Sequence, residues 1–199
     1  MVRPPNRITM PTLVLGLVGA HGSGKGMAGA YLERTYRAAT FRFSDPLSDI
    51  LVRLSLPVTR DHLIKLSEIV RRTFGQSVLA DAVASACSRV PNHLVVIDGF
   101  RRLADLVPFE HLAGFHLAAI QTRAETRYER TRKRGQTAEE RHQSYQEFLA
   151  VHERSTEISI AEVLPRADVH LSNDGTPDEL FVQLDQYLTT LGITKITAP

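Results

Sequence analysis

The feature that most constrains the fold is a glycine-rich heptapeptide that directly follows a short apolar run. The run spans residues 12–18 (TLVLGLV), and the heptapeptide Gly19-Ala-His-Gly-Ser-Gly24-Lys25 has the spacing GxxxxGK. Glycines let the backbone curl so that successive N–H groups converge on an anion, and a helix that starts at the lysine adds its positive end. The heptapeptide therefore predicts a phosphate-binding loop at a strand-to-helix turn, rather than a plain glycine-rich turn.

Short apolar segments alternate with helical segments along the rest of the chain. The predicted strands are residues 12–18, 41–44, 93–97, 115–120 and 167–171. The predicted helical segments are residues 26–37, 46–89 with breaks near Pro57 and Gly75, 123–164 with a break at Gly135, and a last helix capped by Thr176. Alternation of this kind favours an α/β fold, with a parallel sheet covered by helices on both faces. Ligands of such folds bind at the carboxyl ends of the strands.

The composition is that of one folded domain. A length of 199 residues fits one domain at about 150 residues per domain, and 43% hydrophobic residues exclude a mainly disordered chain. Residues 1–11 hold three prolines and no apolar stretch, which predicts a flexible leader without a secretory signal, ahead of a single domain over residues 12–199. No apolar run reaches the roughly 18 residues of a membrane helix, so we expect a cytoplasmic protein without a membrane partner.

Charge and cysteine content exclude other classes. The single cysteine, Cys87, cannot form an internal disulfide, and no Cys/His cluster indicates zinc. The net charge is only +2, which gives no argument for nucleic-acid binding. Arginine outnumbers lysine by 20 to 4, and arginine binds carboxylates and phosphates through two donors at once, although a GC-rich genome also enriches it.

The sequence around the heptapeptide resembles a known family. GAHGSGKG, residues 19–26, is similar to the loop of adenylate kinase and related nucleoside monophosphate kinases, whose P-loop superfamily includes deoxynucleotide kinases and dephospho-CoA kinase. In those loops the residue after lysine-glycine is usually threonine, whereas here it is Met27. The resemblance implies a three-layer P-loop kinase fold with a helical acceptor-binding insert at about 46–90 and a lid at about 130–145. It implies nucleotide contacts from Gly19, Ala20, His21, Gly22, Ser23, Gly24, Lys25, Gly26 and Met27.

A second predicted strand ends in an acid that two arginines follow, IDGFRR at residues 97–102. An aspartate in this place either holds the waters around a nucleotide-bound Mg²⁺ or caps the next helix. The segment also resembles the DGFPR motif of adenylate-kinase-type enzymes. Arg102 stands where the family's arginine binds substrate phosphate, and Arg101 replaces the family's proline. We therefore predict that Asp98 is catalytic through metal-bound water and that Arg102 binds the acceptor.

Two further segments supply candidates for acceptor binding. Asp45 follows the second strand, where it orients the acceptor, accepts a proton from a hydroxyl, or caps the next helix. Arg71 and Arg72 precede the break at Gly75, and this segment resembles the substrate-binding insert of the same superfamily, in which an arginine before such a glycine faces the acceptor phosphate. Successive helical residues point about 100° apart, so one of the two faces the cleft. We predict Arg72.

The densest basic run, residues 122–135, has arginines at helical spacing on one face: Arg123, Arg127, Arg130 and Arg134. One alternative is a solvated, salt-bridged helix. Another is a nucleic-acid-binding face, which is disfavoured because the run contains only one aromatic residue that could stack on bases and the net charge is low. A third interpretation is a lid that brings arginines onto a transferring phosphoryl group. The resemblance supports the lid, because the family's lid carries arginines on both sides of a short turn. We predict Arg130 as a nucleotide contact, and Arg134 and Arg141 as catalytic.

The loop after the last strand, residues 172–175, is a simple turn or, as the resemblance implies, the loop beside the nucleotide base. Under the second interpretation Asn173 contacts the nucleotide. Lys25, Asp98, Arg134 and Arg141 are then the predicted catalytic residues.

The residues and the resemblance together predict a phosphotransferase that uses ATP and Mg²⁺ and moves the γ-phosphoryl group to a nucleoside or deoxynucleoside monophosphate. One alternative is phosphorylation of a sugar hydroxyl, as in dephospho-CoA kinase, with Asp45 as the base. Another is a non-catalytic nucleotide-binding module, because Gly26 and Met27 depart from the usual loop. A nucleotide switch or motor ATPase is disfavoured, since the chain has no NKxD motif and Gly99 follows Asp98.

Overall fold

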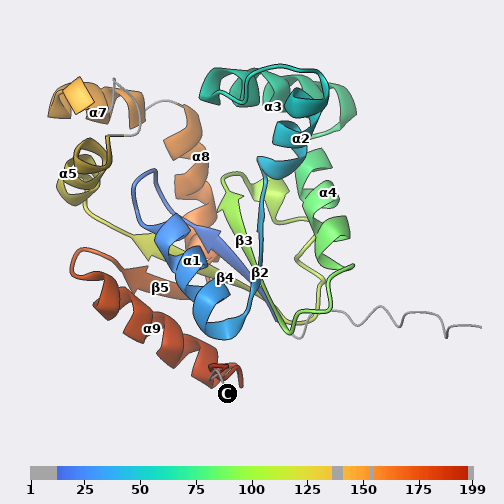
Figure 1. Ribbon diagram of the computed structural model, residues 1–199, viewed down its shortest axis with the longest axis vertical. Helices are drawn as coiled ribbons and strands as arrows, with labels where there is room; N and C mark the ends of the chain where they lie inside the picture. The colour runs from blue at the N-terminus through green and yellow to red at the C-terminus, as the bar shows by residue number, and fades with distance from the viewer. Residues whose placement is uncertain (1–12, 136–140, 153–154, 197–199) are drawn as a thin grey trace, which may run out of the picture.

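Five parallel strands form the centre of the protein, in the order β2-β3-β1-β4-β5 (Figure 1). The computed structural model describes residues 13–135, 141–152 and 155–196. The strands are β1 (Leu13–Val18), β2 (Ala39–Arg42), β3 (Leu94–Phe100), β4 (Phe115–Gln121) and β5 (Val169–Ser172). The α-helices are α1 (Lys25–Tyr36), α2 (Asp45–Arg53), α3 (Arg60–Phe74), α4 (Val78–Cys87), α5 (Ala124–Arg134), α7 (Tyr145–His152), α8 (Ser155–Val163) and α9 (Pro177–Thr190), and two 3₁₀ turns are η1 (Leu103–Asp105) and η2 (Leu164–Arg166). The predicted α/β fold is confirmed; the predicted leader, residues 1–11, lies outside the described residues.

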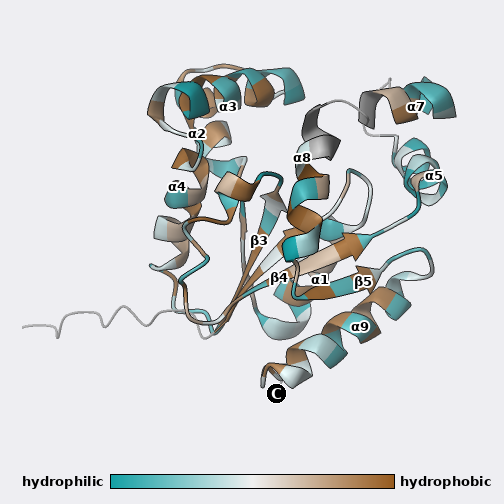
Figure 2. Ribbon diagram, turned by 180° about the vertical axis from the view of Figure 1, so that it is seen from behind, coloured by the Kyte–Doolittle hydropathy of each residue, from teal (hydrophilic) through white to brown (hydrophobic). Residues whose placement is uncertain are grey.

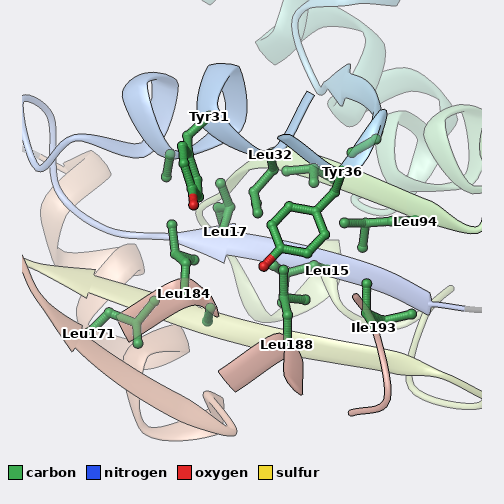
Figure 3. Packing of buried hydrophobic residues seen from close by; sticks show 14 of the residues in the cluster. Leu15, Leu17, Tyr31, Leu32, Tyr36, Leu94, Leu171, Leu184, Leu188 and Ile193 are labelled. Carbon is green, nitrogen blue, oxygen red and sulfur yellow. The ribbon is translucent and has the colours of Figure 1, made fainter. Parts of the chain in front are cut away.

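The two faces of β1 show how the sequence builds the sheet. All six residues of this strand are buried, as its continuous apolar run predicts. Side chains alternate between the faces of a strand, so Leu13, Leu15 and Leu17 join the core beneath α1 and α9 (Figure 3), whereas Val14 and Val18 join the core beneath α4 and α8. Helices thus cover both faces, and hydrophobic residues follow the central strands and the helices packed on them (Figure 2).

A cluster of polar side chains connects α1 to α9 at the edge of the core beneath these two helices. The hydroxyls of Tyr31 and Tyr36 donate to Asp185 at 2.7–2.9 Å, and Lys195 forms an ion pair with the same carboxylate at 2.6 Å. Burial raises the pKa of Asp185, but hydrogen bonds from Lys195 and the two tyrosines outweigh it, so the pKa lies below its ordinary value. The cluster therefore favours the charged carboxylate in the folded chain.

Two strand boundaries differ from the prediction in ways that place the site. β2 begins at Ala39 and ends at Arg42, so the expected strand residues 43–44 form a turn instead. β3 continues past Asp98 to Phe100 because Gly99, at φ 114°, forms a bulge: Leu17 pairs with Asp98, and Val18 pairs with Phe100. The aspartate therefore lies beside the end of β1, where the glycine-rich loop starts.

The helices that follow the sheet's carboxyl edge lie in two groups (Figure 1). α2 and α3 lie on one side, and α5 and α7 on the other. The predicted breaks near Pro57 and Gly75 coincide with the ends of α2 and α3, and Gly135 ends α5 in the left-handed conformation. Among the described residues, no helix is long and apolar enough to cross a membrane.

Candidate active site

The glycine-rich loop, residues 19–25 and hereafter the P-loop, connects β1 to the first turn of α1. Gly24 is the N-cap at φ 102°, and a Cβ atom there would collide with the side-chain amide of Asn173. Lys25 opens the helix, and its Nζ donates to the carbonyl oxygens of Gly19 at 2.7 Å and Ala20 at 3.1 Å. The lysine thus stands at the positive end of α1, as a phosphate-binding loop requires.

Two side chains that follow other strands of the sheet form hydrogen bonds to the backbone of the P-loop. Asn173, which follows β5 and is 1% exposed, donates from Nδ2 to the carbonyl of Ser23 at 2.7 Å. Thr122, just after β4, donates from its hydroxyl to the same carbonyl at 3.0 Å. The structure thus shows Asn173 as a support of the loop; the predicted nucleotide contact stays a prediction. The role of Thr122 was not predicted from the sequence, because an isolated threonine after a strand belongs to no recognisable motif.

The arginine face of α5 points at the P-loop and at the loop after β5. Arg127 donates to the backbone carbonyl of His21 at 3.2 Å, and Arg134 lies 3.2 Å from the Nε2 atom of the same histidine. Arg130 donates to the carbonyls of Asn173 at 2.6 Å and Gly175 at 2.8 Å. Arg127 and Arg130 therefore hold backbone in and beside the P-loop, and Arg134 contacts a side chain of the loop.

The first arginine of this face, Arg123, pairs with Asp174 at 3.4 Å. A hydrogen bond from the backbone N–H of Arg123 lowers the pKa of Asp174. Arg141 is exposed and donates to the carbonyl of Gly135 at 2.8 Å. Residues 136–140, in the middle of the predicted lid, lie outside the described residues.

A cavity of about 830 Å³ opens between the P-loop and α3. Its P-loop side comprises the loop, α5 and the loop after β5; its α3 side comprises α3, the turn after β2 and the segment that follows Asp98. The arginines that line it are Arg42, Arg60, Arg71, Arg101, Arg102, Arg130 and Arg134. The carboxylates that line it, among the described residues, are Asp98 and Glu68. Apolar lining comes from Phe43, Leu47, Leu63, Ile64 and Leu79.

One face of α3 supplies much of this lining. Arg60, Leu63, Ser67 and Arg71 recur at intervals of three and four, so they share one side of the helix. The same spacing was present in the sequence, but it is also the spacing of an ordinary buried face. Only the packing of α3 shows that this face borders a cavity.

Asp98 occupies the place that the sequence predicts for it. It lies between the ends of β1 and β2, paired in register with Leu17 and Arg42, and it lines the cavity. Its Oδ1 atom is buried and has no hydrogen-bond partner in the described part of the chain. A buried acceptor without a partner costs free energy unless a ligand or water satisfies it, so this oxygen fits a water of a hydrated cation.

The donor set fits a metal that is held mostly by water and phosphate. Gly26 and Met27, which replace the usual hydroxyl residue, offer no oxygen from a side chain. The described residues contain no group of three His, Cys, Asp or Glu side chains suited to a metal. Mg²⁺ keeps several waters when it binds nucleotide phosphates, so one carboxylate in the outer shell is compatible with it.

Asp45 and Arg72, two predicted acceptor residues, do not line the main cavity. Asp45 is exposed in the first turn of α2, accepts the backbone N–H of Arg42 at 2.7 Å, and does not line the cavity. The geometry gives no support to Asp45 as a base. Arg72 lines only a smaller neighbouring cavity of about 350 Å³, whereas Arg71 and Arg102 line both this cavity and the main one. Acceptor binding by Arg72 stays a prediction.

A family model described as an AAA domain matches residues 15–156. The chain belongs to this AAA domain family. A UPF0200 protein of Hyperthermus butylicus is 25% identical to this AAA-domain protein over 179 residues, which cover 90% of this chain and 95% of the relative.

Solved kinases share the fold of the AAA-domain protein. The shikimate kinase from Acinetobacter baumannii in complex with shikimate has a TM-score of 0.56 at 15% identity, over 92% of this chain and 95% of that one. A gluconokinase from Sinorhizobium meliloti 1021 has a TM-score of 0.56 at 11% identity, over 92% and 98%. At such identities the likeness shows the fold alone. The AAA-domain protein therefore has a P-loop kinase-type fold, and the predicted resemblance is confirmed at that level.

Proposed function

We propose that the protein is an ATP-dependent phosphotransferase that moves the γ-phosphoryl group to the phosphate of a nucleoside or deoxynucleoside monophosphate. The observation that carries this proposal is the charge of the cavity. Seven arginines and Lys25 line it, against two carboxylates among the described residues, so the cavity suits a ligand with several negative charges. The apolar lining from the turn after β2 and from α2, α3 and α4 suits the flat body of a base.

Each side of the cavity has a separate task in this proposal. The P-loop amides and Lys25 bind the outer phosphates of ATP, while Arg130 and Arg134 keep the surrounding loops in place. Arg102 binds the acceptor phosphate. Asp98 would hold Mg²⁺ through bound water, and the ion would supply positive charge to the β and γ phosphates. Because the acceptor phosphate is already an anion near neutral pH, the reaction needs positioning and charge stabilisation more than a base.

A second candidate is transfer to a hydroxyl group of an anionic small molecule. One observation favours it: a solved structure of the same fold is a shikimate kinase with shikimate bound. The base would then be one of the two carboxylates in the cavity, Glu68 on α3 or Asp98, and not Asp45, which lies outside it. Arginines would bind the anionic group of the acceptor in this case as well.

A coupled assay separates the candidates. The chain is incubated with Mg·ATP and, in turn, with the ribo- and deoxyribonucleoside monophosphates, dephospho-CoA and shikimate, and ADP release is followed. We expect turnover with at least one monophosphate, at a rate well above the ATP hydrolysis seen without an acceptor. Turnover confined to dephospho-CoA or shikimate would establish a hydroxyl acceptor. Tight Mg·ATP binding by calorimetry without turnover on any acceptor would identify a non-catalytic nucleotide-binding module.

A further inference from the structure

A buried ion pair joins α3 to the segment that follows Asp98. The guanidinium of Arg71 lies 2.8 Å from the Oδ1 atom of Asp105, and the two residues are 6% and 0% exposed. They are separated by α4 and β3 along the chain, so the pair connects two parts of the α3 side that the backbone leaves independent.

The other oxygen of this carboxylate holds the backbone of two cavity arginines. Oδ2 of Asp105 accepts the backbone N–H groups of Arg101 at 3.0 Å and Arg102 at 3.1 Å. Asp105 is the third residue of η1, and it reaches back to the residues before the turn as an acid does in a helix cap. One carboxylate therefore fixes the chain direction at Arg101 and Arg102, whose side chains then line the cavity.

Gln76 is a third residue of this network, because it contacts both Arg71 and Arg102. Arg71 also donates to the backbone carbonyl of Gln76, and the side chain of Arg102 donates from Nη1 to Oε1 of the same glutamine at 3.1 Å. Arg102 is thus held at its backbone by Asp105 and at its guanidinium by a residue next to the end of α3. Because the charge of Arg71 is matched by Asp105 in a buried place, Arg71 serves this network and does not offer an unpaired charge to a ligand.

Stability alone is a weak reason for such a pair. Taking two charges out of water costs about as much free energy as their attraction returns, and apolar pairs of similar volume often replace them without loss. A loop arginine that binds phosphate, in contrast, needs its backbone within a fraction of an ångström of the productive position.

We propose that Asp105 is a positioning residue for acceptor binding, which sets Arg101 and Arg102 at the cavity and ties them to α3 through Arg71. This inference rests on the proposed function. It assigns to Arg71 the role of a support, and to Arg102 the direct contact with the acceptor.

The test compares full-length variants by steady-state kinetics with Mg·ATP and the best monophosphate of the panel. Asp105→Asn keeps the shape of the side chain and removes its charge. We expect the KM for the monophosphate to rise about tenfold or more, with the KM for ATP changed less than about twofold. Glu179→Gln is the matched control, since Glu179 accepts the backbone N–H of Thr176 in the same kind of cap at α9, at 3.0 Å, and does not line the cavity between the P-loop and α3. It should leave the acceptor KM as it is.

Loss of one charge from a buried pair can prevent folding, so a double variant complements the test. Arg71→Met with Asp105→Leu replaces the pair by apolar side chains that fill the same space, which should retain the melting temperature. The backbone N–H groups of Arg101 and Arg102 then lose their acceptor, and we expect the acceptor KM to stay raised about tenfold. A merely structural role predicts a normal acceptor KM once the fold is stable.

The outcomes distinguish the two proposals. A wild-type chain that transfers to no monophosphate would overturn the proposed function and this inference with it. If the wild type is active, two results would overturn this inference alone. One is a normal acceptor KM in the stable double variant, and the other is an equal rise of both KM values in Asp105→Asn.

Discussion

On the P-loop side of the cavity, the arginines of α5 bind other groups of the protein, even where they line the cavity; on the α3 side, Arg42 and Arg60 line the cavity without such partners in the described part of the chain. Arg127 and Arg130 donate to backbone carbonyls, and Arg123 pairs with Asp174. Arg42 and Arg60 line the cavity, and within the described part of the chain their guanidinium groups make no hydrogen bond or ion pair. The same residue type therefore organises a binding loop on one side and offers unmatched charge on the other.

This difference has a physical basis. A P-loop binds phosphate through backbone N–H groups, so its requirement is a fixed backbone, and arginines that bind neighbouring carbonyls meet it. A second anionic ligand has no such loop on the α3 side, where side chains must supply the positive charge themselves. Variants on the two sides should thus affect the two ligands separately.

The largest effect is expected at the centre of the P-loop side. Lys25→Ala removes the cation that reaches the outer phosphates, and turnover should fall by about 10³-fold or more, while the fold remains. Turnover and circular dichroism check this together. Lys65→Ala, on an exposed position of α3 that does not line the cavity, is the matched control and should retain turnover. Unimpaired turnover in Lys25→Ala would remove the P-loop from the reaction.

A smaller and more selective effect is expected on the α3 side. Arg102→Ala removes a charge-assisted contact, which should raise the acceptor KM about 10- to 100-fold and leave the KM for ATP near its wild-type value. Initial rates at varied acceptor and fixed ATP measure it. Arg72→Ala in the same assay tests the prediction made from the sequence. An acceptor KM that rises more for Arg72→Ala than for Arg102→Ala would reverse the assignment of the two arginines.

Because the arginines of α5 hold the backbone near the P-loop, a variant there should raise the KM for ATP and leave the acceptor KM unchanged. Arg130→Ala leaves the carbonyls of Asn173 and Gly175 without their donor, and loosening this backbone should raise the KM for ATP about fivefold, with the acceptor KM unchanged. Arg132→Ala is the control, because Arg132 lies over the ring of Tyr128 and does not line the cavity. A rise confined to the acceptor KM would show that Arg130 serves the other ligand.

A change remote from both sides should alter stability and neither KM. Asp185→Asn weakens the bonds from Tyr31, Tyr36 and Lys195 and should lower the free energy of unfolding by about 1–3 kcal/mol near neutral pH. The pKa of Asp185 is depressed in the folded chain, so its contribution is full above the unfolded value of about 4 and is lost as the pH falls through the lower folded value.

Thermal melts of the two chains between pH 7 and 3 check the contribution of Asp185. The difference in melting temperature between wild type and Asp185→Asn should shrink below about pH 4. A difference that grows at low pH would contradict the cluster as described. A selective change in one KM would show that the α1–α9 contact reaches the cavity.

Several features of the fold and the candidate site could be predicted from short sequence patterns. The P-loop could be located because its glycines and lysine are adjacent in sequence and act through their own backbone. The position of Asp98 followed from the rule that parallel strands place their carboxyl ends at one edge. The cap of α9 was equally local, since Thr176, Pro177 and Glu179 satisfy one another within four residues.

The direction of a side chain after a strand or at the end of a helix could not be obtained in this way. Asp45 turns back to the N–H of Arg42, and the choice between Arg71 and Arg72 depends on how α3 rotates about its axis. That rotation is set by contacts with distant segments, among them the pair of Arg71 with Asp105 and the packing of Leu63, Leu66 and Val70 against the core.

The sequence by itself determined the parallel α/β sheet, the P-loop and the aspartate beside it, because hydrophobic periodicity and backbone geometry act over neighbouring residues. Only the tertiary structure decided which arginines bind other groups of the protein and which leave their charge unmatched at the cavity. Guanidinium groups reach far and bind any oxygen within range, so their role depends on which carbonyls and carboxylates the fold brings to them.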